Sequence, residues 1–460
     1  MIRLSSRRSK GRAIALAAAI SLTAAGLASC SGGSEPETSM PEVDNFSWNN
    51  YEGDTLNVLL SRNPLADMIQ GEVASFEKKT GITVNIETLT ETDYMVKILS
   101  ALQSQSGSYD VFMTSAPMNF QYAAAGWIEN LQPWVDDPKQ TSPEYDFEDF
   151  YPALIEANRW NKEPFSGLGE GPLWAIPANE EGYALFYRKD ILKKFGIEVP
   201  QTIDELIAAA KKLDGKTYQS QTINGFVSRG DKTYPTLNPF STFAGAYGVQ
   251  DVTDGEASIN TRAGVTALQK WAELMSTGSQ AAATYTWYEA QQAFMAGTAA
   301  FYIDADHMAN AFEGDDSNIA GEVGYALPPK GPEGRASSMW VWSLGMNASS
   351  ERKGAAWQFI QWATAKDTLT TGLDYGNINP TRTSVADSEA MAEYTSNWGD
   401  YNKVWRQILA DYAHWQYAPD GTWTEVGDIW ATAIQKVVLG QDSAEQALND
   451  AAKEINTIIQ

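Results

Sequence analysis

Apolar runs of strand length alternate with segments of helical periodicity in the first third of the chain. Runs at 54–60, 82–87 and 109–113 each precede a stretch whose apolar residues recur at helical spacing. This alternation predicts right-handed βαβ units and a parallel sheet. Ligands of such sheets bind beyond the carboxyl ends of the strands. Candidate binding residues at that edge are Arg62, Asn63, Thr114 and Met118.

A strand that runs into a helix is predicted over Ser337–Ala365. Residues in a strand alternate between its faces, so Trp340 and Trp342 share one side. Apolar residues at helical spacing then continue to Ala363. Periodicity alone fits an ordinary buried unit, whereas two tryptophans on one strand face also suit a ligand.

The rest of the chain gives a mixed pattern. Two extended pieces around an acidic bend are predicted near Asn179–Glu181, followed by a helix. Thr202 and Glu205 form a capping-box signature for the next helix. Further helices are predicted at Thr261–Thr277 and Trp287–Met295, then a strand at Thr298–Asp304, and the last hundred residues are mostly helical.

The N-terminus has the features of an export signal. With 460 residues the chain is long enough for two domains. The first twelve residues hold five basic and no acidic side chains, and the apolar run Ala13–Leu27 is too short to cross a membrane comfortably. This run leads into Leu27-Ala28-Ser29-Cys30, which resembles the lipobox of bacterial lipoproteins. Lipidation of Cys30 is therefore predicted, with residues 31–50 as a flexible tether.

Cysteine usage and charge exclude several functions. Cys30 is the only cysteine, so a thiol catalyst, a cysteine zinc site and an internal disulfide are ruled out. The net charge of −25 argues against nucleic acid and anionic substrates and for a neutral or cationic ligand. Solubility outside the cell would explain the same charge.

No catalytic, metal or cofactor motif is present. The two histidines lie in different predicted helices, and no H-E-x-x-H, P-loop or G-x-S-x-G occurs. With 58 acidic residues, a pair of hydrolytic carboxylates cannot be recognised from the sequence. The chain is instead rich in aromatic and amide side chains, which suit a sugar ligand. Tryptophan and tyrosine stack on the C–H face of a sugar, and planar polar groups form hydrogen bonds with its hydroxyls.

Several motifs, in order, resemble the extracellular solute-binding lipoproteins of ABC-type sugar importers, of the maltose-binding-protein kind. The motifs are the lipobox, Tyr109-Asp110-Val111, Gly126-Trp127-Ile128, ALFYRKDIL at 184–192, GIEVPQTIDEL at 196–206, FMAGTAAFYID at 294–304, Trp340–Ala363 and Asn379-Pro380-Thr381-Arg382. The tryptophan pair and residues 326–332 are also similar to the sugar-alcohol and oligosaccharide branches.

The resemblance implies an α/β, two-lobe periplasmic-binding-protein fold. Each lobe would hold a mostly parallel sheet flanked by helices, and crossing hinge strands would join them. The N-terminal lobe would comprise 51–178 and 304–346, and the C-terminal lobe 179–303 and 347–460. The ligand would lie in the cleft between them.

Together with the sheet-edge argument, the resemblance implies a ligand site without catalytic residues. The candidates are Arg62, Asn63, Thr114, Met118, Glu181, Tyr234, Trp287, Asp304, Trp340, Trp342, Asn377 and Arg382. Thr114, Met118 and His307 depart from the maltose-binding pattern and argue against maltose itself.

The sequence therefore suggests capture of a sugar, oligosaccharide or polyol by hinge closure, for delivery to the transmembrane subunits of an ABC permease. The protein would be a monomer, held by the lipid on Cys30 to the extracytoplasmic face of the cell membrane, with no cofactor and no nucleic-acid partner. A secreted hydrolase or lyase, and a binding protein for a peptide, polyamine or phosphodiester, are the alternatives. The particular sugar is not indicated.

Overall fold

The computed structural model describes residues 40–415 and 417–460. The signal segment, Cys30 and residues 31–39 of the expected tether lie outside the described residues. The N-terminal part confirms the expected βαβ units, with strands β1, β2 and β3 parallel in the order β2-β1-β3. Its elements are β1 (Thr55–Ser61), α1 (Pro64–Thr80), β2 (Thr83–Leu89), α2 (Glu91–Gln103), β3 (Val111–Thr114) and α3 (Ala116–Ala124).

Local chemistry fixes the ends of α1, which begins at the edge where a ligand is expected. The Asn63 side chain accepts a hydrogen bond from the backbone N–H of Ala66, and Pro64 occupies the first turn, where no amide hydrogen is needed. Gly81 ends the helix with a φ of 72°, a conformation that glycine adopts without strain.

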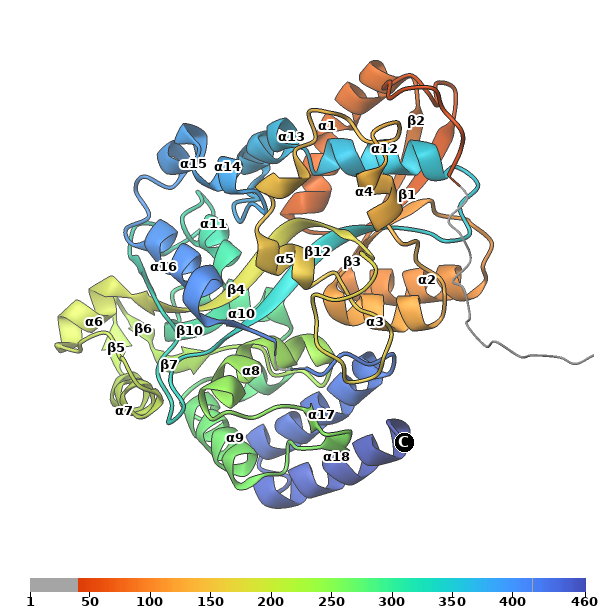
Figure 1. The fold of residues 1–460 in the computed structure, drawn as a ribbon. Helices are drawn as coiled ribbons and strands as arrows, with labels where there is room; N and C mark the ends of the chain where they lie inside the picture. The colour runs from red at the N-terminus through yellow and green to blue at the C-terminus, as the bar shows by residue number, and fades with distance from the viewer. Residues whose placement is uncertain (1–39, 416) are drawn as a thin grey trace, which may run out of the picture. The chain divides into compact units, whose positions relative to one another are not determined.

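Two long strands, β4 (Ile176–Arg188) and β12 (Ser337–Met346), run antiparallel through the centre of the molecule (Figure 1). They extend the sheet to the order β2-β1-β3-β12-β4-β10-β7, with β10 at Ala299–Ala305 and β7 at Asn224–Val227. β4 also pairs with β11 (Val323–Ala326). These central strands connect the parallel N-terminal part to the β10 and β7 side.

The prediction of a bend at Asn179–Glu181 is wrong. These residues lie inside the unbroken strand β4 and are buried. Acidic residues and a glycine suggested a loop, but their polar groups have partners within the fold. The backbone N–H of Gly182 donates to Asp306, and Glu181 accepts from Trp342.

Helices cover both sides of this sheet. Those expected at Thr261–Thr277 and Trp287–Met295 are present as α9 and α10, and the capping box of Thr202 and Glu205 starts α7. The remaining helices are α4 (Gln132–Asp136), α5 (Pro152–Glu156), α6 (Lys189–Phe195), α7 (Ile203–Leu213), α8 (Leu237–Ala246), α9 (Arg262–Met275), α10 (Trp287–Met295), α11 (Ala309–Phe312), α12 (Lys353–Ala363), α13 (Lys366–Thr371), α14 (Thr383–Ala386), α15 (Glu389–Tyr394), α16 (Tyr401–Gln407), α17 (Trp423–Val438) and α18 (Ala444–Ile458). Short two-residue strands complete the fold as β5 (Thr217–Tyr218), β6 (Gln221–Thr222), β8 (Val252–Thr253), β9 (Glu256–Ala257) and β13 (Ala413–His414).

Helix α12 requires a correction to the expected lobe boundaries. The sequence placed residues 347–460 in the C-terminal lobe, but α12 packs against α1 (Figure 1). Phe359 makes an edge contact with Phe76, their ring centroids 5.3 Å apart, and Trp362 also contacts Phe76. The apolar stripe of α12 thus packs on α1 of the N-terminal part. The rest of the lobe division stays a prediction.

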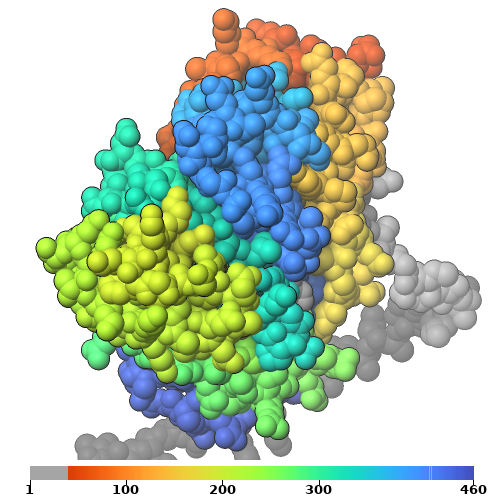
Figure 2. Space-filling model, turned by 90° about the vertical axis from the view of Figure 1, so that its left-hand side faces the viewer, coloured from red at the N-terminus to blue at the C-terminus, as the bar shows by residue number. Residues whose placement is uncertain are grey.

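The segment that contains α15 and α16 lies at the surface, between the N-terminal elements and the segment that contains α6 and α7 (Figure 2). Across residues 40–415 and 417–460, every helix is too short or too polar for a membrane span.

Candidate functional site

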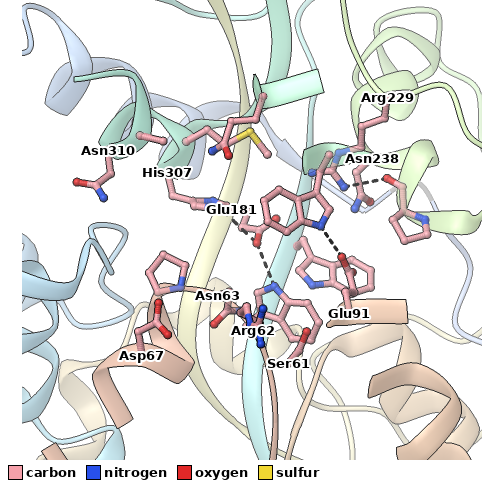
Figure 3. Close-up of a pocket in the computed structure, with 18 residues that line it drawn as sticks. Ser61, Arg62, Asn63, Asp67, Glu91, Glu181, Arg229, Asn238, His307 and Asn310 are labelled. Atoms are coloured by element: carbon pink, nitrogen blue, oxygen red, sulfur yellow. Dashed lines mark hydrogen bonds and ion pairs between the residues drawn. The ribbon is translucent and has the colours of Figure 1, made fainter. Parts of the chain in front are cut away.

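A cavity of about 280 Å³ lies where the central strands pass between the N-terminal elements and the β10 side (Figure 3). Segments far apart in the sequence contribute its walls: the end of β1, the starts of α1, α2 and α10, the loop before α8, the turn after β10, and strands β4 and β12. The lining residues are Ser61, Arg62, Asn63, Pro64, Asp67, Glu91, Glu181, Arg229, Pro235, Asn238, Trp287, Gln291, His307, Met308, Asn310, Ala311, Trp340 and Trp342.

The floor of the cavity is built by the pairing of β4 with β12. Trp340 lies directly opposite Glu181 in the antiparallel register. Trp342, two residues along the same face, donates from its indole N–H to Glu181 Oε1 at 3.0 Å. The two indoles meet edge to face, with centroids 5.6 Å apart. Strand alternation therefore puts two indoles and one carboxylate side by side.

A second indole–carboxylate pair closes one side. Glu91 is the first residue of α2, and Trp287 is the first residue of α10. The Trp287 indole N–H donates to Glu91 Oε2 at 2.7 Å. Two of the three carboxylates that line the cavity, Glu91 and Glu181, are thus each fixed by an indole, which leaves acceptor capacity for a ligand.

Arg229, from the loop between β7 and α8, is the cavity cation that the sequence did not reveal. Its Nε lies 3.0 Å from both oxygens of Asp304 at the end of β10, and its Nη2 lies 2.5 Å from Oδ1. Both side chains are buried. A lone arginine in an irregular segment carries no periodic or motif signal, whereas Asp304 could be predicted from its place at a strand end.

Burial shifts the protonation of the cavity groups toward their neutral forms. It raises the pKa of Glu181 to about 8, although Arg229 opposes this shift, and it raises the pKa of Glu91. Burial also lowers the pKa of His307 to about 4. The Nδ1 of His307 lies 3.9 Å from Glu181 Oε1 and has no hydrogen-bond partner among the described residues. The site therefore favours uncharged hydrogen-bonding groups at neutral pH.

Half of the residues expected at the site line this cavity. They are Arg62, Asn63, Glu181, Trp287, Trp340 and Trp342. Tyr234 and Asp304 lie one layer behind the wall. Tyr234 stacks on Trp340 with centroids 6.0 Å apart, and Asp304 holds Arg229.

The other four expected residues do not line the cavity. Thr114 is buried and donates to Asn119 Oδ1 at 2.7 Å, and Met118 packs in the core. Asn377 accepts a hydrogen bond of 2.6 Å from Asn179. Arg382 is fully buried and donates to the backbone oxygens of Thr364, Asp146 and Tyr145.

Replacing Arg382 with lysine tests this structural role. Lysine keeps the charge but loses the planar fork, so several buried carbonyls lose their donor and stability falls by about 2 kcal/mol. Urea unfolding measures the loss, and binding by the folded fraction stays unchanged. Arg406→Lys, at a partly exposed ion pair with Asp387, is the control and changes stability by well under 1 kcal/mol. Weaker binding by folded Arg382→Lys would contradict the assignment.

Metal binding finds no support in this geometry. In the part of the chain that the structure describes, no group of three or more histidine, cysteine or acidic side chains is arranged to hold a metal ion.

The chain is similar to known solute-binding proteins. Residues 62–369 match the profile of the family described as bacterial extracellular solute-binding protein. The erythritol/L-threitol-binding protein of Mycolicibacterium smegmatis is 31% identical over 454 residues, covering 96% of this chain and 94% of that protein. A mannitol-binding protein of Pseudomonas aeruginosa is 24% identical and covers 69% of this chain and 67% of its own length.

A solved structure confirms the expected two-lobe fold. The solute-binding protein of an ABC transporter from Agrobacterium radiobacter, in complex with ribitol, aligns with a TM-score of 0.78. It is 23% identical, and the alignment covers 88% of this chain and 99% of that one.

Proposed function

The chain belongs to the bacterial extracellular solute-binding protein family, and we propose that it captures a small polyol or monosaccharide for an ABC-type importer. The observation that carries this proposal is the cavity wall itself. Three indoles offer flat apolar surfaces for C–H groups, and Glu91, Glu181 and Asn238 offer acceptors and donors for hydroxyls. Two relatives, one named as an erythritol/L-threitol-binding protein and one as a mannitol-binding protein, support the same ligand class.

The size of the cavity favours a short ligand. Its volume of about 280 Å³ is just below the range of roughly 300–1,000 Å³ found for small-molecule sites. A polyol of four to six carbons or a single sugar ring suits this space better than an oligosaccharide. Within the ligand class expected from the sequence, we therefore favour the small members.

Capture proceeds by closure of the two lobes over the ligand. A ligand drives closure only through contacts that the closed state adds. The bond between Trp287 and Glu91 joins α10 on the β10 side to α2 on the N-terminal side, and we propose it as such a contact. We propose that the permease then accepts the closed form.

Replacing Trp287 with phenylalanine tests that contact. The ring surface remains, but the hydrogen bond to the Glu91 carboxylate is lost, so affinity falls about tenfold, or about 1.4 kcal/mol. Calorimetric titration measures the change. Tyr288→Phe alters the exposed neighbouring aromatic and should leave affinity unchanged. Unchanged affinity in Trp287→Phe would remove this bond from the closure mechanism.

The proposed function is tested by titrating the purified protein with erythritol, L-threitol, ribitol, D-mannitol, glucose and maltotriose. A true ligand at 100 times its Kd stabilises the fold by about 2.7 kcal/mol, which thermal unfolding detects. Short polyols or monosaccharides should stabilise, and maltotriose should do so less. Stabilisation by none of them contradicts the proposal, and release of new products on long incubation would instead indicate an enzyme.

Attachment to the extracytoplasmic face of the membrane through a lipid on Cys30 is also proposed, as is a monomeric state. The lipobox-like tetrapeptide supports the anchor. Cys30→Ser should move the protein from the membrane fraction to the soluble fraction, and Ser29→Thr should leave it bound. Absence of a covalently bound fatty acid in the unmodified protein would exclude the lipid anchor.

A further inference from the structure

Arg229 is the buried cation of the cavity wall, and Asp304 occupies the edge of its guanidinium that a carboxylate would use. The carboxylate of Asp304 contacts both Nε and Nη2, the two donors that form a parallel fork. Asp304 is itself fixed, because Tyr302 donates to its Oδ2 at 2.8 Å and the backbone N–H of Ala305 donates to its Oδ1 at 2.8 Å. The pair is therefore a built part of the wall.

The remaining donors of Arg229 are mostly engaged as well. Nη1 donates to the backbone oxygen of Pro235 at 3.1 Å, and Nη2 donates to the Tyr183 hydroxyl at 3.4 Å. These bonds use all but one of the five N–H groups of a guanidinium. The last N–H suits a single hydroxyl oxygen, whereas a carboxylate or phosphate is best held by two parallel donors.

The charge around this position also disfavours an anion. Arg229 lines the cavity, and Asp304 offsets the charge of Arg229 from behind. Arg62, the second arginine of the lining, has an exposed side chain. An anionic ligand would give up its hydration at a wall where the guanidinium fork of Arg229 is already occupied and its charge is offset.

From these contacts we propose that Asp304 determines specificity: by occupying the guanidinium edge of Arg229 it restricts the site to uncharged hydroxylated ligands and excludes sugar acids. This inference rests on the proposed function. Asp304 acts as a positioning residue, because it touches Arg229 and does not line the cavity.

The test compares matched pairs of ligands that differ only in one end group. Erythritol is paired with erythronate and D-mannitol with D-mannonate, and each is titrated calorimetrically at one ionic strength. The unmodified protein should bind the preferred alditol at least about 100-fold more tightly than its aldonate. In Asp304→Asn the guanidinium fork becomes available, so the alditol-to-aldonate ratio should shrink at least about tenfold.

The matched control is Asp306→Asn, which makes the same carboxyl-to-amide change at a buried residue two positions further along and leaves the partner of Arg229 in place. Its alditol-to-aldonate ratio should equal that of the unmodified protein. A ratio in folded Asp304→Asn that stays within threefold of the unmodified value would overturn the proposal.

The unmodified protein decides the matter even where Asp304→Asn does not fold. Aldonate binding within about threefold of alditol binding would overturn the proposal, because the occupied fork should prevent it. Binding of alditols with rejection of aldonates supports it. If neither the alditols nor the other sugars of the panel bind, the proposed function is wrong, and this inference is wrong as well.

Discussion

Replacing Trp340 with alanine is expected to weaken binding of the preferred polyol or sugar about 100-fold, or about 2.7 kcal/mol. The indole stacks between Tyr234 behind it and the cavity in front, and only 3% of the residue is exposed. Truncation removes the flat surface for the ligand and also the support of Trp342, whose N–H fixes Glu181. One substitution therefore disturbs two of the indoles and a carboxylate.

Calorimetric titration with the alditol preferred by the unmodified protein measures the loss, and urea unfolding verifies that each variant is folded. Trp340→Phe keeps a ring at the same place and should recover most of the affinity. Trp127→Ala removes a half-buried tryptophan that packs on Tyr122 outside the cavity, so its affinity should be unchanged. Binding by Trp340→Ala within threefold of the unmodified protein would show that the indole is only structural.

Local patterns were sufficient to predict the βαβ units and the strand of the tryptophan pair. The capping box at Thr202, the glycine stop at Gly81 and the alternation in β12 each depend on neighbours in sequence. β4 was predicted with a bend because charged residues rarely lie inside a strand. Glu181 instead accepts from Trp342 on β12, and the backbone N–H of Gly182 donates to Asp306 in the turn after β10, which no local pattern reports.

The candidate site was predictable only where the chain carries a repeated or strand-end signal. Trp340 and Trp342 share a strand face, and Arg62 follows β1. Arg229 and Glu91 were missed. Arg229 lies in a loop without periodicity, and Glu91 stands at the start of a helix whose apolar spacing does not mark it, so tertiary folding alone brings them to the cavity.

Arg382 and Asn377 show the converse error. Arginine and amide side chains near aromatics suit a sugar, but the same donors also suit the chain's own carbonyls. Arg382 ties residues 145, 146 and 364 together, and Asn377 bonds to Asn179. Hydrogen-bonding type alone therefore cannot separate a ligand contact from a structural one.

A pair of buried carboxyl groups, Glu180 and Asp306, lies on the other face of β4 from Glu181. Asn379 donates from one nitrogen to Glu180 Oε1 at 3.2 Å and to Asp306 Oδ1. Tyr401 donates to the Asn379 oxygen. The second oxygens, Glu180 Oε2 and Asp306 Oδ2, have no hydrogen-bond partner within the described residues. Burial raises the pKa of Asp306 to about 8, and burial with the nearby Asp306 raises that of Glu180. The pair therefore holds at least one proton at neutral pH.

The raised pKa makes stability fall with rising pH. An unfolded aspartate releases its proton near pH 4, whereas the folded Asp306 retains it to about 8. Between these pH values the folded state binds more protons than the unfolded state. The stabilisation that the protonated Asp306 contributes is therefore complete below pH 4 and decreases as the pH rises to 8. The free energy of unfolding falls by at most about 1.4 kcal/mol per pH unit. The surrounding titratable groups are Glu181 on β4, His307 beside Asp306, and Tyr401 on α16. The pKa of Glu181, also raised, gives a slope of the same sign.

Asp306→Asn removes this loss, because an amide does not ionise and its Oδ1 still accepts from Gly182. Relative to the unmodified protein, the variant should gain about 3 kcal/mol of stability between pH 5 and pH 8. Urea unfolding at the two pH values measures the gain, with exposed Asp315→Asn as the charge control. If the free energy of unfolding of Asp306→Asn and of the unmodified protein changed with pH in parallel, the pKa of Asp306 would not be raised by folding. A steeper gain than one proton allows would show that Glu180 gives up its proton in the same pH range.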